Sequence, residues 1–219
     1  GVGGAVKAVD MIMAGEVRNA FVACRPPGHH AERSTPMGFC LFGTVAIAAK
    51  HALEHHGLAR VAIVDFDVHH GNGTQDLLWD EKRALLITSQ QIPLFPGTGR
   101  ADETGAYDTI LNIPLPPGSG GAQMRQEYQD KAFPRLRAFE PELIIISAGF
   151  DAHADDPGLH AGRPQTGRCP VQAADPTVLF RDPGWHADAD RHLDQPLGGW
   201  CGAGTGFGGF QHFRSHAAR

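Results

Sequence analysis

Residues 61–75 read VAIVDFDVHHGNGTQ, an apolar run that ends in a group of metal-binding side chains. Val61 to Val64 are apolar and mostly β-forming with no polar alternation, which is typical of a strand buried on both faces in a parallel sheet. Ligand sites of open α/β sheets lie just past the carboxyl ends of such strands. The polar side chains that follow this strand are Asp65, Asp67, His69, His70 and Asn72. The stretch therefore predicts an α/β fold with a site at this strand end.

The pair Asp67 and His69 is the most informative part of the stretch. Side chains two residues apart on an extended segment point to the same side. A carboxylate oxygen and an imidazole nitrogen suit zinc, and three protein ligands with an open fourth position are typical of a catalytic zinc site. The alternative is an acidic strand end that caps the next helix through Asn72 or Thr74, with both histidines solvated. A third ligand would favour zinc.

The composition favours a single domain. With 219 residues, 42% of them apolar, the chain is long enough for one sizeable core. Its net charge of -5, without a basic cluster, argues against nucleic-acid binding. Its apolar stretches are too short to span a membrane, and residues 1–10 do not read as a signal peptide. Because the sequence starts without Met, inside an expected helix, we expect a further N-terminal part. The cysteines lack C-x-x-C spacing, which favours reduced thiols and a cytoplasmic protein; they are Cys24, Cys40, Cys169 and Cys201.

Expected helices and strands alternate along the chain, in the order typical of a parallel sheet. Glycine and proline separate the segments, and the loop at residues 90–108 is long enough to suggest a functional role. The expected strands are residues 20–24, 61–64, 84–89, 109–115 and 142–147, and the expected helices are residues 1–15, 41–56, 74–82 and 122–139, the last one kinked or split at Pro134.

Two other expected strands also end in candidate ligands. The strand at residues 20–24, which is expected to be short and buried, leads into RPPGHH, where prolines and a glycine hold a rigid loop with His29 and His30. The strand at residues 142–147 leads to Asp151. Parallel strands joined by right-handed crossovers place all three ends on one edge of the sheet. This convergence favours a metal site over a surface turn whose histidines have no function.

Histidines on the expected helix at residues 41–56 are interpreted differently. His51, His55 and His56 lie on or near its polar face. We expect them to be solvated rather than to bind a metal.

The segment after Pro157 differs in composition from the rest. Residues 158–219 contain no Lys, Glu, Ile, Met, Asn or Tyr, but they include 11 Gly and 5 Pro. Neither helical nor strand periodicity is visible there. The segment is therefore interpreted as an atypical tail, disordered or read in a shifted frame, following a partial domain at residues 1–157.

Six ordered motifs resemble the histone deacetylase superfamily, closest to its class II and bacterial histone-deacetylase-like amidohydrolase branch. They are RPPGHHA, GFC, VDFDVHHGNGTQ, FPGTG, NIPLPPGSG and SAGFDAHADDP, all within residues 1–157. The resemblance implies an arginase-like α/β sandwich around a parallel sheet, incomplete at both ends. It also implies zinc-dependent hydrolysis of the N-acetyl amide of acetyl-lysine or acetylpolyamine.

The resemblance also implies roles for particular residues. Asp67, His69 and Asp151 match the family's zinc ligands. His30 matches the general base with Asn72 behind it, and His29 matches its partner, oriented by Asp65. Three further positions match the walls of a narrow acyl-lysine channel, and four match a structural potassium site. The channel positions are Gly38, Phe39 and Phe95, and the potassium positions are Asp65, Asp67, His69 and Ser89.

Two departures from the family pattern concern the rim of the channel and the expected activity. Ser89-Gln90-Gln91 stands where the family usually has Ser-x-His. The family's C-terminal Gly-Gly-Tyr, whose tyrosine donates a hydrogen bond to the developing oxyanion, has no match. The chain has two tyrosines, Tyr107 and Tyr128, and neither follows a Gly-Gly pair. Losing such a donor commonly costs about 100- to 1,000-fold in rate.

Four interpretations of the chain remain open on the sequence alone. The first is a zinc-dependent deacetylase, and the second is an impaired form that binds zinc and acyl-lysine but turns over poorly. The third is a fragment that does not fold stably. The fourth is a binuclear manganese ureohydrolase of the same fold, which is disfavoured because His153 stands where that class needs an aspartate.

Overall fold

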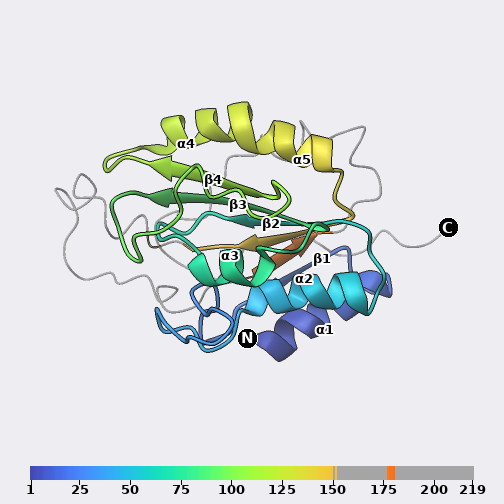
Figure 1. Ribbon diagram of the computed structural model, residues 1–219. Helices are drawn as coiled ribbons and strands as arrows, with labels where there is room; N and C mark the ends of the chain where they lie inside the picture. Colours follow the sequence, from blue (N-terminus) through green and yellow to red (C-terminus); the bar gives the residue numbers. More distant parts are fainter. Residues whose placement is uncertain (150, 152–176, 181–219) are drawn as a thin grey trace, which may run out of the picture. The chain divides into compact units, whose positions relative to one another are not determined.

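A six-stranded sheet forms the centre of the computed structural model, which describes residues 1–149, 151 and 177–180 (Figure 1). Its strand order is β1-β6-β5-β2-β3-β4. The strands are β1 (Asn19–Val22), β2 (Val61–Asp65), β3 (Ala84–Gln91), β4 (Ile110–Leu115), β5 (Leu143–Ser147) and β6 (Thr177–Phe180).

Strand β2 lies between two parallel neighbours. Val61 is in register with Ala84 of β3 and Leu143 of β5, and β4 continues the parallel part beyond β3. All five residues of β2 are buried, which confirms the prediction made for the apolar run Val61 to Val64. Because β2, β3 and β5 run in one direction, the residues after them meet at one edge of the sheet.

Helices cover both faces of the sheet, giving three layers (Figure 1). The helices α1 (Val2–Met13), α2 (Thr44–Glu54) and α3 (Asn72–Leu78) lie on one face, and a segment made of α4 (Gly121–Glu127), the π-helix η1 (Tyr128–Ala132) and α5 (Phe133–Phe139) lies on the other. Alanines on the buried side of α2 allow α1 and the sheet to approach it closely. None of the helices in the described part of the chain is long and apolar enough to cross a membrane.

The expected interruption at Pro134 takes the form of a π-helical turn. The five residues of η1 end just before α5, and Pro134 stands in the first turn of α5. Proline has no N–H to donate, and the π-helical turn before it, in which the Phe133 N–H bonds to the carbonyl of Tyr128, lets the helical segment adjust at this point. The helix therefore continues past Pro134.

The structure differs from the sequence prediction at both β1 and β6. Strand β1 is not fully buried, since Phe21 is 60% exposed. Strand β6 lies in the segment interpreted as having no strand, and it pairs antiparallel with β1 and β5. The sheet is therefore mixed rather than wholly parallel. Strand β6 falls in one compact unit with the rest of the sheet, Gly1–Pro183, and the other residues of 158–219 lie outside the described part.

The prediction of solvated histidines on α2 is wrong for two of the three. The side chains of His51 and His56 are only 21% and 19% exposed, and both contact Asp10 of α1. The periodicity of α2 alone does not show that α1 packs beside it.

Candidate metal and catalytic site

Three chain segments bring the sequence-predicted site residues together at the carboxyl edge of the sheet. Asp65 ends β2, and Asp67 and His69 follow it. The loop after β1 supplies His29 and His30. Asp151, the third expected ligand, comes four residues after β5 ends at Ser147.

Asp67, His69 and Asp151 form a compact set of metal-binding atoms. Their ligand atoms lie within 4.8 Å of one another. His69 Nδ1 is 3.0 Å from Asp67 Oδ1 and 2.8 Å from Asp151 Oδ2. Gly149 leaves room for this arrangement, because a Cβ at that position would lie 1.9 Å from Asp67 Oδ2. The donor set matches the carboxylate and imidazole chemistry that zinc prefers.

The protonation properties of these residues indicate a site for a cation. Hydrogen bonds to Asp151 and Asp67 raise the pKa of His69 to about 10. Burial raises the pKa of Asp67, whereas the His69 hydrogen bond and the Val68 N–H outweigh burial and lower the pKa of Asp151. Positive charge is therefore stabilised between the two carboxylates, and the residues present fit zinc.

His30 is held as a neutral imidazole with a defined tautomer. Its Nδ1 is 2.8 Å from Asn72 Oδ1, and Asn72 Nδ2 donates to Glu32 Oε1 at 2.6 Å. Because the carboxylate of Glu32 accepts from the amide nitrogen, the amide oxygen faces His30, and Nδ1 must donate the proton. Burial and the neighbouring His29 lower the pKa of His30 to about 4. Its Nε2 is consequently available as a proton acceptor.

His29 has a carboxylate partner in place of an amide. Its Nδ1 donates to Asp65 Oδ2 at 3.0 Å, and its Nε2 lies 3.8 Å from Asp67 Oδ2. Asp65 is fully buried and also accepts the N–H of Asp67. This contact fixes the ring orientation of His29, with its Nε2 directed at Asp67.

Three expected channel residues lie at different depths. Gly38 has φ +55°, and a Cβ there would lie 2.2 Å from His30 Cδ2, so its backbone passes directly against the His30 ring. The Phe95 ring is edge-on to His30, with ring centroids 5.1 Å apart, and is 48% exposed. Phe39 is 92% exposed, which places it at the rim rather than in the wall.

A buried network that the sequence reasoning missed supports the loop carrying Phe95. His70 Nδ1 is 2.7 Å from Thr98 Oγ1, and His70 Nε2 is 3.1 Å from Gln75 Oε1. Gln90 donates to the carbonyl of Gly99 at 2.7 Å. Adjacent residues on an extended segment point to opposite sides, and this alternation could have separated the role of His70 from that of His69. Glu32, which orients Asn72, carried no such signal because it is 40 residues away in sequence.

Ser89 and the two tyrosines occupy other surroundings. The hydroxyl of Ser89 is 3.0 Å from the Tyr128 hydroxyl, and burial raises the pKa of that tyrosine. Tyr107 is 56% exposed in the loop before β4. The potassium site expected near Asp65 and Ser89 stays a prediction.

Comparison with known proteins identifies a matching family, related sequences and a similar fold. The family model for the histone deacetylase domain matches residues 1–175. The histone deacetylase-like amidohydrolase of Pseudomonas aeruginosa is 43% identical over 157 residues, covering 70% of this chain and 41% of that protein. Histone deacetylase 10, chloroplastic, of Oryza sativa subsp. japonica is 47% identical over 140 residues, covering 63% of this chain and 32% of that protein.

A solved structure shares the fold. The crystal structure of acetylpolyamine aminohydrolase from Burkholderia pseudomallei superposes with a TM-score of 0.63 at 35% sequence identity. The match covers 70% of this chain and 46% of that one. The chain thus spans less than half the length of these relatives.

Proposed function

Because this chain belongs to the histone deacetylase family, we propose that its site hydrolyses the N-acetyl amide of acetyl-lysine or an acetylpolyamine with one zinc ion. The observation that carries the proposal is the position of a neutral His30 beside the cation site of Asp67, His69 and Asp151. The relatives are described as deacetylases and amidohydrolases, which agrees with this reaction class.

The roles of the site residues follow from their contacts. Bound zinc would polarise the amide carbonyl and lower the pKa of a water molecule to about 7. His30 would accept the proton of that water at Nε2, while its Nδ1–H stays on Asn72. His29, oriented by Asp65, would stabilise the charge that develops or pass a proton to the leaving amine. Gly38, Phe39 and Phe95 would border the path of the acyl-lysine stem.

Zinc content and turnover, measured on the same purified chain, test the proposal. We expect about one catalytic zinc per chain and release of acetate from a fluorogenic acetyl-lysine substrate. Asp67→Ala should remove both this catalytic zinc and the release of acetate. Asp102→Ala is the matched control, because it removes an exposed carboxylate that pairs with Arg100. Equal zinc and equal turnover in the two variants would contradict the assignment.

A second candidate is a form that binds zinc and acyl-lysine with little turnover. It is favoured by the placement of the tyrosines, since Tyr128 bonds to Ser89 and Tyr107 is exposed. An oxyanion donor is commonly worth about 100- to 1,000-fold in rate. Zinc-dependent binding of an acetyl-lysine peptide by calorimetry, without acetate release, would select this candidate. Chain that retains no zinc would contradict both.

Composition supports a proposal about the surroundings of the protein. Cys24 and Cys40 are thiols, which suits a reducing compartment such as the cytoplasm. A basic acetylated peptide or polyamine is compatible with a net charge of -5.

A further inference from the structure

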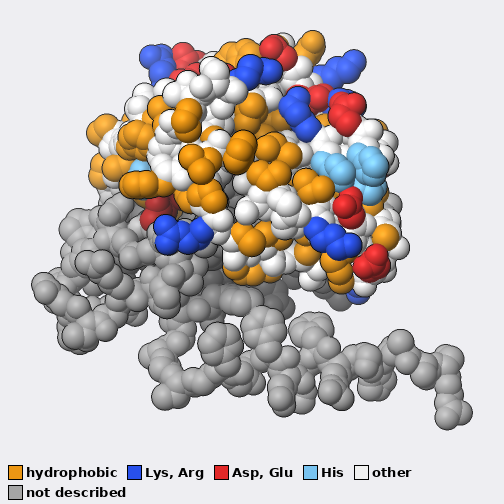
Figure 2. Space-filling view, turned by 90° about the horizontal axis from the view of Figure 1, so that it is seen from below, with side chains coloured by type: hydrophobic (Ala, Val, Ile, Leu, Met, Phe, Trp, Pro, Cys, Tyr) orange, Lys and Arg blue, Asp and Glu red, His pale blue; other side chains and the backbone are white. Residues whose placement is uncertain are grey.

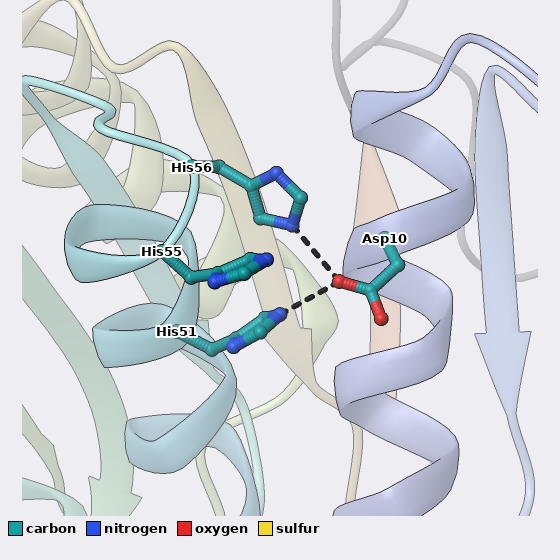
Figure 3. A group of neighbouring side chains, drawn as sticks. All are labelled: Asp10, His51, His55 and His56. Carbon is teal, nitrogen blue, oxygen red and sulfur yellow. Dashed lines mark hydrogen bonds and ion pairs between the residues drawn. The ribbon is translucent and has the colours of Figure 1, made fainter.

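A second cluster of metal-binding side chains lies between α1 and the end of α2 (Figure 3). It consists of Asp10 on α1, His51 on the last turn of α2, and His55 and His56 directly after it. All three imidazoles extend toward the helix that carries Asp10 (Figure 3). Figure 2, which views the side of the molecule where α1 and α2 lie, shows a group of histidine side chains at the surface.

The geometry of the cluster resembles a metal site more than a chance surface group. His51 and His55 are four residues apart, and their rings stack at 4.8 Å with an interplanar angle of 12°. Histidines at this helical spacing bind a metal ion from one face. His56 meets both rings edge-on, with centroids 5.1 Å from His51 and 4.8 Å from His55. One ligand atom from each of the four residues lies within 4.8 Å of the others.

We propose that Asp10, His51, His55 and His56 bind a second zinc ion that joins α1 to α2. Three imidazoles and one carboxylate give the four ligands of a tetrahedral zinc site with no open position, as in structural sites. His51 Nε2 and His56 Nε2 are 2.7 Å and 2.9 Å from Asp10 Oδ1. Ligands about 2.1 Å from a tetrahedral zinc are about 3.4 Å apart, so His51 and His56 would move away from Asp10 by about 0.5–0.7 Å. The ligand atom of His55 already lies within 4.8 Å of the other three. The ion would replace the protons that now link these atoms.

The second site is separate from the catalytic one. The amino end of α2 packs against the catalytic loop, because a Cβ on Gly28 would lie 2.8 Å from the N atom of Thr44. The histidines lie at the opposite end of this helix of 11 residues. With a rise of 1.5 Å per residue, the two ends are about 16 Å apart. The two metal-binding groups share no residue, so each can be removed without altering the ligands of the other.

Zinc stoichiometry after dialysis tests the inference on the full chain. We expect two zinc ions per chain in the parent protein and one in the double variant His51→Gln/His55→Gln. Glutamine keeps the size and hydrogen-bonding capacity of the side chain but is a poor zinc ligand. Glu54→Gln is the matched control, since it changes an exposed residue on the same turn outside the cluster, and it should retain both ions.

Thermal unfolding gives an independent measure without using activity. In the Asp67→Ala background, where the proposed catalytic zinc is lost, added zinc should raise the unfolding temperature, because an ion that binds only the folded chain stabilises it. Adding His51→Gln/His55→Gln to that background should abolish the rise. Circular dichroism before heating shows whether each variant is folded.

The outcomes distinguish this inference from the proposed catalytic function. One zinc per chain that is lost in Asp67→Ala but kept in the histidine variant would overturn the second site. One zinc lost in the histidine variant but kept in Asp67→Ala would support the second site and contradict the catalytic one. Zinc that leaves the Asp10 cluster on dialysis would identify it as a hydrogen-bonded contact only and would also overturn the inference.

Discussion

Replacing Gly38 by alanine is expected to disable His30, the proposed general base, while leaving the proposed zinc ligands intact. Gly38 has φ +55°, a conformation that disfavours residues with a Cβ. An added Cβ would lie 2.2 Å from Cδ2 and 2.6 Å from Cγ of His30. The His30 ring must therefore move, and movement breaks its contact with Asn72 or closes the space beside Phe95.

Two costs of this substitution can be separated by a matched control. The left-handed backbone conformation costs roughly 1–2 kcal/mol for a residue with a Cβ. Crowding a packed site costs about 1–3 kcal/mol more. Gly118 has φ +82° with nothing within 4 Å of an added Cβ, so Gly118→Ala bears the first cost alone. The free energy of unfolding should fall by about 1–3 kcal/mol more in Gly38→Ala than in the control.

Urea unfolding and the acetyl-lysine assay measure the two consequences. Displacement of a catalytic group by 1 Å can cost about 100-fold in rate, so kcat/KM should fall by about that factor in Gly38→Ala. The control should retain its activity, and both variants should hold zinc. Equal stability and equal kcat/KM in the two variants would refute the close approach of Gly38 to His30.

Three further changes test other parts of the site. In zinc-free protein, the pKa of about 4 for His30 lies below the ordinary 6.5, so between those pH values only the unfolded chain takes up this proton. The free energy of unfolding should therefore fall by up to about 3 kcal/mol as the pH drops from 6.5 to 4. Urea titrations of His30→Asn should show a weaker dependence on pH. Thr98→Val removes a partner of buried His70 and should lower the free energy of unfolding by about 1–3 kcal/mol, measured by the same titrations. Gly149→Ala places a Cβ against Asp67 and should lower the zinc content, measured by elemental analysis, while Gly118→Ala should not.

The parallel part of the sheet and the meeting of three strand ends could be predicted from the sequence. The apolar run at Val61 to Val64 identifies a central strand by itself, and parallel direction then brings its end next to that of β5. These are consequences of local pattern and of chain direction. The shared edge therefore needed no knowledge of side-chain packing.

Features that depend on packing between distant segments could not be predicted in the same way. Asp10 meets His51 because α1 and α2 lie side by side, and neither helix alone carries a sign of the contact. Strand β6 has only four residues, and its place comes from hydrogen bonding to two neighbours rather than from periodicity. Glu32 turns Asn72 toward His30 from a loop with no pattern of its own.

The opposite behaviour of two histidines gives the strongest argument for the assignment of base and metal ligand. His30 and His69 have ring centroids only 6.0 Å apart, yet the pKa of one is lowered to about 4 and that of the other is raised to about 10. His30 is buried against His29 and bonds to a neutral amide, whereas His69 lies between two carboxylates. Titratable groups whose surroundings separate their pKa values in this way have distinct chemical roles. A cation beside His69 and a neutral proton acceptor at His30 would give the division of roles that the proposed metal-assisted amide hydrolysis requires.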